Sequence, residues 1–179
     1  MSGNHDSNLR TATISVLVDN EAGILARVIG LFTGRGYNID SLTVAPVEAD
    51  GALSRINLVT SGTAMVITQI KAQLDRLVQV HRVSDLTEEG PHVAREMALV
   101  KVVGVGEARV EAMRIAETFR ARVVDTTTGS FVFEITGASE KLDAFIDLMR
   151  DLGLAEVSRT GIAALARGPR TISTLSSNH

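Results

Sequence analysis

The 179-residue sequence predicts an α+β fold made of two successive βαββαβ units, each an antiparallel sheet with two helices on one face. Two observations support this prediction. Segments of alternating apolar residues and segments of helical apolar spacing follow one another in the same order twice along the chain. Between the two series, residues 87–91 read Thr-Glu-Glu-Gly-Pro, a polar segment typical of a linker. Only the order of elements repeats, because no constant offset aligns identical residues.

The first unit is expected to open with a strand over 11–18, where apolar residues alternate with others. Asp19 and Asn20 follow it, with side chains suited to capping a helix. Apolar residues at helical spacing then predict a helix over 25–32, which the glycines after it end. Asp50-Gly51 is a hairpin signal between the next two strands. The remaining elements of this unit are strands over 39–48 and 53–60, a helix over 66–77 and a strand over 78–86.

The second unit follows the same order. Gly104-Val-Gly106 looks like the start of a dinucleotide-binding loop, but Arg109 occupies the third glycine position, so we interpret it as a strand-to-helix turn. Gly129-Ser130 is expected to close a hairpin in which Asp125 faces Glu134, both as solvated charges. The expected elements are a strand over 97–103, a helix over 110–119, strands over 123–128 and 131–136, a helix over 142–149 and a strand over 154–165.

These elements define two domains over 11–87 and 94–167, with polar tails over 1–10 and 168–179 that we expect to be flexible. A domain of about 75 to 80 residues buries only about 60% of its unfolded surface and is marginally stable alone. Each sheet would also expose the unpaired backbone groups of its edge strands and the face that carries no helices, and both are usually covered by other parts of a protein. Self-association supplies both, so the sequence predicts at least a homodimer.

Composition excludes several classes of function. The chain has no cysteine, which rules out disulfides, thiolate metal sites and cysteine nucleophiles. Aromatic residues make up 3%, which predicts an aliphatic core and argues against a base-stacking surface. A net charge of -3 also argues against a nucleic-acid partner. No apolar stretch approaches the roughly 18 residues that span a bilayer, and residues 1–8 do not form a signal peptide. We therefore expect a cytoplasmic protein with no membrane partner.

A search for catalytic chemistry finds no candidate. Neither the nucleophile-elbow motif nor the phosphate-binding loop motif occurs. The histidines, His5, His81, His92 and His179, lack the spacing of metal ligands. The sequence therefore predicts a chain that is not an enzyme, without catalytic residues, a metal site or a cofactor of its own.

One group of residues suits the binding of a small amino acid. The loop between the first strand and the first helix leads into a helix start, whose unpaired N–H groups attract a carboxylate. Gly23 allows close approach to that backbone, and Asn20 can donate and accept hydrogen bonds toward a zwitterion. Asn38 enters the next strand beside the same helix, while Leu25 and Ile39 offer aliphatic walls. The structural alternative is that both asparagines serve as caps or turn residues and that Gly23 only packs.

The run Ser15–Phe32, followed by Arg35–Pro46, resembles the start of the acetolactate synthase (acetohydroxyacid synthase) small subunit. The opening motif alone would indicate only an ACT domain, a widespread amino-acid-sensing βαββαβ module. Later segments narrow the resemblance to the small-subunit family, and it extends over about 11–167. These later segments are Leu53–Arg55, Leu77–Leu86, Arg95–Lys101 and Lys141–Phe145.

The resemblance implies an ACT domain over 11–87 that senses an amino acid and dimerises, and a ferredoxin-like C-terminal domain over 94–167. It implies a regulatory subunit of branched-chain amino acid (valine and isoleucine) biosynthesis that is not catalytic. Such a subunit binds a larger catalytic subunit carrying thiamine diphosphate, Mg²⁺ and FAD, raises its activity, and confers feedback inhibition by valine, sometimes by leucine or isoleucine. Paired ACT domains bind the effector at their interface. The positions that match the family's valine-binding pattern are Asn20, Gly23, Ile24, Leu25, Asn38 and Ile39.

Three other functions fit the same order of elements. A stand-alone ACT-type amino-acid-binding module would need a DNA-binding or catalytic segment, which neither tail supplies. An RNA-binding module would need aromatic residues on its strands. A small hydrolase of the acylphosphatase type would need a phosphate-binding arginine after the first strand, where this chain has Asp19-Asn20-Glu21.

Overall fold

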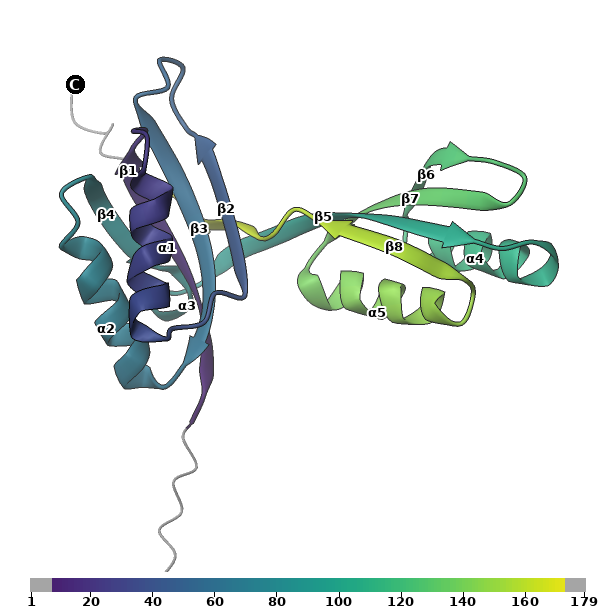
Figure 1. Cartoon of the computed structure of the whole chain (residues 1–179), viewed down its shortest axis with the longest axis horizontal. Coiled ribbons are helices and arrows are strands. Elements are labelled where there is room, and N and C mark those ends of the chain that lie inside the picture. The colour runs from purple at the N-terminus through teal and green to yellow at the C-terminus, as the bar shows by residue number, and fades with distance from the viewer. Residues whose placement is uncertain (1–7, 173–179) are drawn as a thin grey trace, which may run out of the picture. The chain divides into compact units, whose positions relative to one another are not determined.

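The computed structural model describes residues 8–172, which form two compact units (Figure 1). The first unit contains residues up to 93 together with residues from 164 onward, and the second contains 94–163. Most of the two tails expected from the sequence lies outside the described residues. Of the tail residues that are described, 168–171 are exposed, whereas Ile172 is buried and only 6% exposed.

The first unit is an antiparallel sheet of strand order β2-β3-β1-β4 with two helices on one face (Figure 1). Strand β1 lies inside the sheet, and its alternating apolar residues point at the helices and form the core with Phe32 and Ile70. The elements are β1 (Arg10–Asp19), α1 (Ile24–Arg35), β2 (Ser41–Pro46), β3 (Leu53–Gly62), α2 (Ala64–Asp75) and β4 (Val80–Asp85).

The second unit repeats this arrangement with strand order β6-β7-β5-β8 and two helices on one face. Its core differs from the aliphatic core expected from composition, because four of the five phenylalanines gather there and the rings of Phe133 and Phe145 meet edge to face. The elements are β5 (His92–Val103), α4 (Gly106–Thr118), β6 (Arg122–Thr126), β7 (Ser130–Gly137), α5 (Ser139–Arg150) and β8 (Leu154–Arg159). Both units thus confirm the α+β prediction of tandem ferredoxin-like domains.

The expected linker and the expected last strand differ from the structure. A short helix, α3 (Leu86–Glu89), occupies most of 87–91, and the Asp85 side chain caps it by accepting from the Glu88 amide at 3.2 Å. The single strand expected over 154–165 is two strands, because the chain turns at Gly161, whose φ is 88°. The second of these, β9 (Ala163–Ala166), pairs with β5, and its last three residues belong to the first unit.

The hairpin between β6 and β7 corrects one expected pair of charges. A bulge after Val123 shifts the register, so Asp125 lies opposite Val132 and not opposite Glu134. Glu134 instead lies opposite Arg122, with 3.5 Å between the guanidinium Nε and the carboxylate. The two acids therefore do not form a carboxylate pair.

Candidate functional site

Helix α1 begins without a side-chain cap, contrary to the cap expected from Asp19 or Asn20. Its N-cap is Gly23, in a left-handed conformation with φ 89° and ψ -6°. The two polar side chains before it are engaged elsewhere. Asn20 donates from Nδ2 to the carbonyl of Gly51 at 2.8 Å, and an Asp19 carboxylate oxygen lies 2.6 Å from Nε2 of His81.

The start of α1 is therefore open to a ligand. The first N–H groups of a helix have no acceptor within the helix, and they carry the positive end of its dipole. At Gly23 a Cβ atom would have no heavy atom within 4 Å, so nothing covers this backbone in the described part of the chain. The arrangement favours an exposed carboxylate at the first turn.

Asn20 is fixed beside this helix start by the turn between β2 and β3. Its amide donates to the carbonyl of Ala52 at 2.9 Å, while its side chain holds Gly51. The Asp50 carboxylate braces the turn by accepting from the Ala52 amide at 3.0 Å. Asn20 remains exposed, so its side-chain oxygen can accept a hydrogen bond from an ammonium group.

The next two candidate residues differ in what they can offer. Ile24 is 6% exposed and packs in the core, and its amide already donates to the carbonyl of Glu21 at 3.4 Å, so neither its side chain nor its amide is free for a ligand. Leu25 is half-buried and can supply an apolar wall. Arg27 and Gln79, which are not part of the predicted amino-acid site, add polar groups near by, and the Arg27 Nη1 donates to the Gln79 Oε1 at 3.2 Å. Gln79 comes from a distant part of the chain, so no local pattern indicated it.

Asn38 and Ile39 lie at the other end of α1, which ends at the left-handed Gly36. The Asn38 carbonyl accepts from the Thr60 hydroxyl at 2.5 Å, and its side-chain amide donates to Asp40. Ile39 is partly buried against the core of the first unit. A helix of 12 residues is about 18 Å long. In a single copy of the chain these residues therefore lie about one helix length from Asn20 and Gly23.

Residues 8–172 contain neither a metal-binding cluster nor a membrane-spanning helix. No group of three or more histidine or acidic side chains there is placed to hold a metal ion. No helix in this range is long and apolar enough to cross a membrane.

Comparison with known proteins accounts for both units. Residues 14–82 match the small-subunit-like ACT domain of acetohydroxyacid synthase, and residues 95–168 match the small subunit of acetolactate synthase. The small subunit of acetolactate synthase isozyme 3 from Escherichia coli is 48% identical over 158 residues, which cover 88% of this chain and 96% of that one. A probable acetolactate synthase small subunit from Archaeoglobus fulgidus is 47% identical over 156 residues, which cover 87% of this chain and 96% of the relative.

A solved structure agrees with the sequence relatives. The crystal structure of the acetolactate synthase small subunit from Thermotoga maritima superposes with a TM-score of 0.79 at 39% sequence identity, covering 89% of this chain and 98% of that chain. Identity at this level over nearly the whole of each relative establishes common descent and a common fold. The chain belongs to the family of acetolactate synthase small subunits.

Proposed function

We propose that this chain is the regulatory subunit of an acetolactate synthase: it binds a separate catalytic subunit, raises its activity and makes it sensitive to valine. Thiamine diphosphate, Mg²⁺ and FAD belong to the catalytic partner in this proposal. Membership of the small-subunit family supports the partnership. The open start of α1 supports the response to an amino acid and is the observation on which the proposal rests.

The chemistry of valine fits the groups at this helix start. The carboxylate is placed on the first-turn amides beside Gly23, where the helix dipole favours negative charge. The ammonium group is placed on the side-chain oxygen of Asn20, which the β2–β3 turn orients. Leu25 provides one apolar wall for the branched side chain.

Asn38 and Ile39 complete the pocket only if they come from a second copy. The two halves of the set lie about 18 Å apart along α1, which is far more than one valine can bridge. In a dimer with a two-fold axis, the Gly23 half of each copy can face the Asn38 half of the other copy, because the same contact occurs twice. We therefore place valine between two ACT domains of a homodimer.

Inhibition requires that valine bind one state of the complex more tightly than the other, since equal affinity would shift no equilibrium. A coupling free energy of about 1 to 3 kcal/mol would change the apparent affinity by about 5- to 150-fold. The second unit is free to contact the catalytic subunit in this scheme, because all six candidate residues lie in the first unit.

The first experiment compares Gly23→Asp with Gly23→Asn in the reconstituted complex. Both substitutions strain the left-handed position, in which asparagine and aspartate are tolerated better than other side chains. Only aspartate adds a negative charge where the carboxylate of valine is placed. We expect Gly23→Asp to abolish inhibition by valine while activation persists, and Gly23→Asn to retain more of the inhibition. Inhibition of the Gly23→Asp complex at the wild-type valine concentration would contradict the proposed role of this helix start.

A mixed dimer tests whether the site is shared. Gly23→Asp and Asn38→Asp homodimers each lose both sites, but a heterodimer of the two variants keeps one site, built from the unaltered half of each copy. We expect calorimetry to show no valine binding to either homodimer and half of the wild-type stoichiometry for purified heterodimers. No recovery in the heterodimer would place both halves in one copy and refute the interface site.

Valine binding without any binding to the catalytic subunit would instead identify a stand-alone ACT-type sensor.

A further inference from the structure

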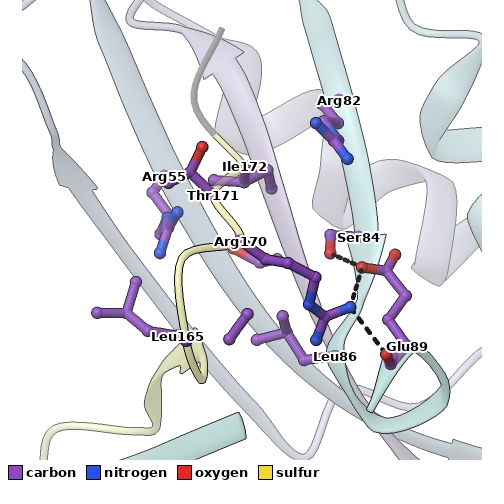
Figure 2. Close-up of a pocket in the computed structure, with 12 residues that line it drawn as sticks. Arg55, Arg82, Ser84, Leu86, Glu89, Leu165, Arg170, Thr171 and Ile172 are labelled. Atoms are coloured by element: carbon purple, nitrogen blue, oxygen red, sulfur yellow. Dashed lines mark hydrogen bonds and ion pairs between the residues drawn. The ribbon is translucent and has the colours of Figure 1, made fainter. Parts of the chain in front are cut away.

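A cavity of about 470 Å³ lies in the first unit on the sheet face that the helices do not cover (Figure 2). Its floor comes from β1, β3 and β4, and residues 165–172, after the chain has returned from the second unit, form one wall. Ala164 and Ile172, at the two ends of this returning segment, are both buried, so the wall packs on the unit and does not merely pass over it.

The register of the sheet brings two arginines to the cavity floor. Leu17 on β1 lies opposite Arg55 on β3 and opposite Arg82 on β4, so all three side chains point to the same face. Neighbouring strands are about 4.8 Å apart, which places the two arginine backbones about 10 Å apart. Both guanidinium groups can therefore reach one ligand between them, and Figure 2 shows both beside the cavity.

These two cations have no carboxylate partner within the described part of the chain. Arg55 donates from Nη1 to the carbonyl of Ala164 at 3.4 Å, and its Nε is buried without a hydrogen-bond partner. Burial lowers the pKa of the Arg55 guanidinium from its usual value, because loss of water disfavours the charged form. Arg82 is paired through its backbone with β1, but its guanidinium has neither an ion pair nor a hydrogen bond among residues 8–172. An anion would relieve the cost of leaving Arg55 partly desolvated.

Glu89 is the one acidic residue among the described residues that line the cavity, and its carboxylate already has hydrogen-bond partners. One carboxylate oxygen of Glu89 accepts from the amide of Asp85 at 3.1 Å, and the other accepts from the hydroxyl of Ser84 at 2.7 Å. The guanidinium of Arg170 lies 3.8 Å from the second oxygen and donates to the carbonyl of Glu89 at 2.8 Å. Three arginines against one glutamate give the lining a formal charge of +2 in a chain whose net charge is -3.

Ser15 is more buried than Ser84, the other serine of the lining. It is only 1% exposed, and its hydroxyl has no hydrogen-bond partner within the described residues. On the sheet it lies opposite Ser84 and two residues before Leu17, on the same face as Arg55 and Arg82. Buried polar groups are nearly always hydrogen-bonded, so this hydroxyl is a donor available to a ligand in the cavity.

We propose that this cavity binds a small organic anion, with a carboxylate or phosphate group on a compact apolar body. The charged group lies between Arg55 and Arg82 and accepts from the hydroxyl of Ser15. The apolar body packs against Leu165, Leu86 and Ile172. The volume falls within the range of small-molecule sites. An anion is favoured over a zwitterion such as valine because the carboxylate of Glu89 has no free side for an ammonium group.

The test titrates the full chain, labelled for NMR, with inorganic phosphate, phenyl phosphate and isovalerate. Isovalerate carries a carboxylate on a branched apolar body but no ammonium group, so it separates this cavity from the valine site. We expect resonances of Ser84, Leu165 and Ile172 to shift saturably with at least one organic probe, while those of Gly23 and Asn38 stay fixed. Tighter binding of phenyl phosphate or of isovalerate identifies which charged group the cavity prefers.

Matched variants make the result decisive. Arg55→Gln and Arg82→Gln should each weaken the binding of the preferred probe about tenfold or more, as expected for loss of a charge-assisted hydrogen bond. Arg76→Gln, at the end of α2 and outside the cavity lining, makes the same change of charge and should leave the affinity unchanged. Equal weakening in all three variants would show general attraction to a basic surface and would refute the site. Absence of saturable shifts at these residues with every probe would show that the cavity holds only water.

Discussion

Gly153 and Gly23 are both left-handed glycines, and alanine at each is expected to have very different consequences. At Gly23, φ is 89° and a Cβ atom would meet nothing within 4 Å, so only backbone strain opposes alanine. At Gly153, φ is 100° and a Cβ atom would lie 2.0 Å from the carbonyl oxygen of Val103. Steric overlap therefore adds to strain at Gly153 alone.

The structure allows the difference to be worked out. Restoring a 3.0 Å contact between the new Cβ and the Val103 oxygen requires the chains to separate by about 1 Å. That movement would lengthen the hydrogen bond from the Val103 amide to the Gly153 carbonyl from 2.8 Å to about 3.8 Å, beyond bonding range. Strain of about 1 kcal/mol, a lost hydrogen bond of about 1 kcal/mol and overpacking of 1 kcal/mol or more give about 3 kcal/mol or more for Gly153→Ala.

Gly23→Ala should cost about 1 kcal/mol or less, because restriction of the unfolded chain offsets part of the strain. Thermal unfolding followed by circular dichroism should then place Gly153→Ala about 6 °C below Gly23→Ala, at roughly 3 °C per kcal/mol. Hydrogen exchange should show the loss of protection in β5 and β8 for Gly153→Ala and near α1 for Gly23→Ala. Equal melting temperatures for the two variants would refute the steric reasoning.

Two further predictions concern ion pairs. Arg159→Met should lower the free energy of unfolding by about 3 to 5 kcal/mol, because it leaves the buried carboxylate of Glu96 without its partner. Arg150→Met removes only the exposed pair with Asp147 and should lower it by less than about 0.5 kcal/mol. Urea unfolding of the two variants measures the difference. The hydrogen bond from Lys71 lowers the pKa of Glu88, so the stability from this pair is fully present above the usual carboxyl pKa and is lost as pH falls through the lowered value. The difference in melting temperature between the wild type and Glu88→Gln, which leaves the Lys71–Asp85 ion pair in place, should therefore stay constant from pH 7 to about pH 5 and narrow toward pH 3. A gap that widens on acidification would contradict this reasoning.

The sequence predicted the order of elements well because each unit buries its apolar residues at regular spacing. In β1 every second residue from Ala12 to Val18 is apolar and joins the core, and α1 carries apolar residues at each turn, so the pattern identified the face of each element that packs. Composition was a poorer guide to the core. It reports an average over the chain, whereas packing gathered Phe119, Phe131, Phe133 and Phe145 into one unit.

The candidate site could be predicted only in part. The pattern located Gly23 and Leu25 at the start of α1, but it assigned the cap to Asn20, whose side chain is drawn away by Gly51, 31 residues later in the sequence. The predicted helix over 25–32 already places Asn38 beyond its far end, but no local pattern shows how two copies of the chain meet. The cavity arginines come from three separate segments, which no local motif joins.

The division of the chain at 93 and 163 makes the second unit an insertion within the first. The Arg167 amide donates to the carbonyl of Pro91 at 3.0 Å, so the two crossing points of the chain are held close together. Stopping the chain near 93 would remove Ala164 and Ile172 and uncover the sheet, although every residue of the candidate amino-acid site would remain. Excising 94–163 and closing the gap with a short linker would keep the first unit whole. The proposed sensing and the proposed partner binding are therefore better separated by internal excision than by truncation.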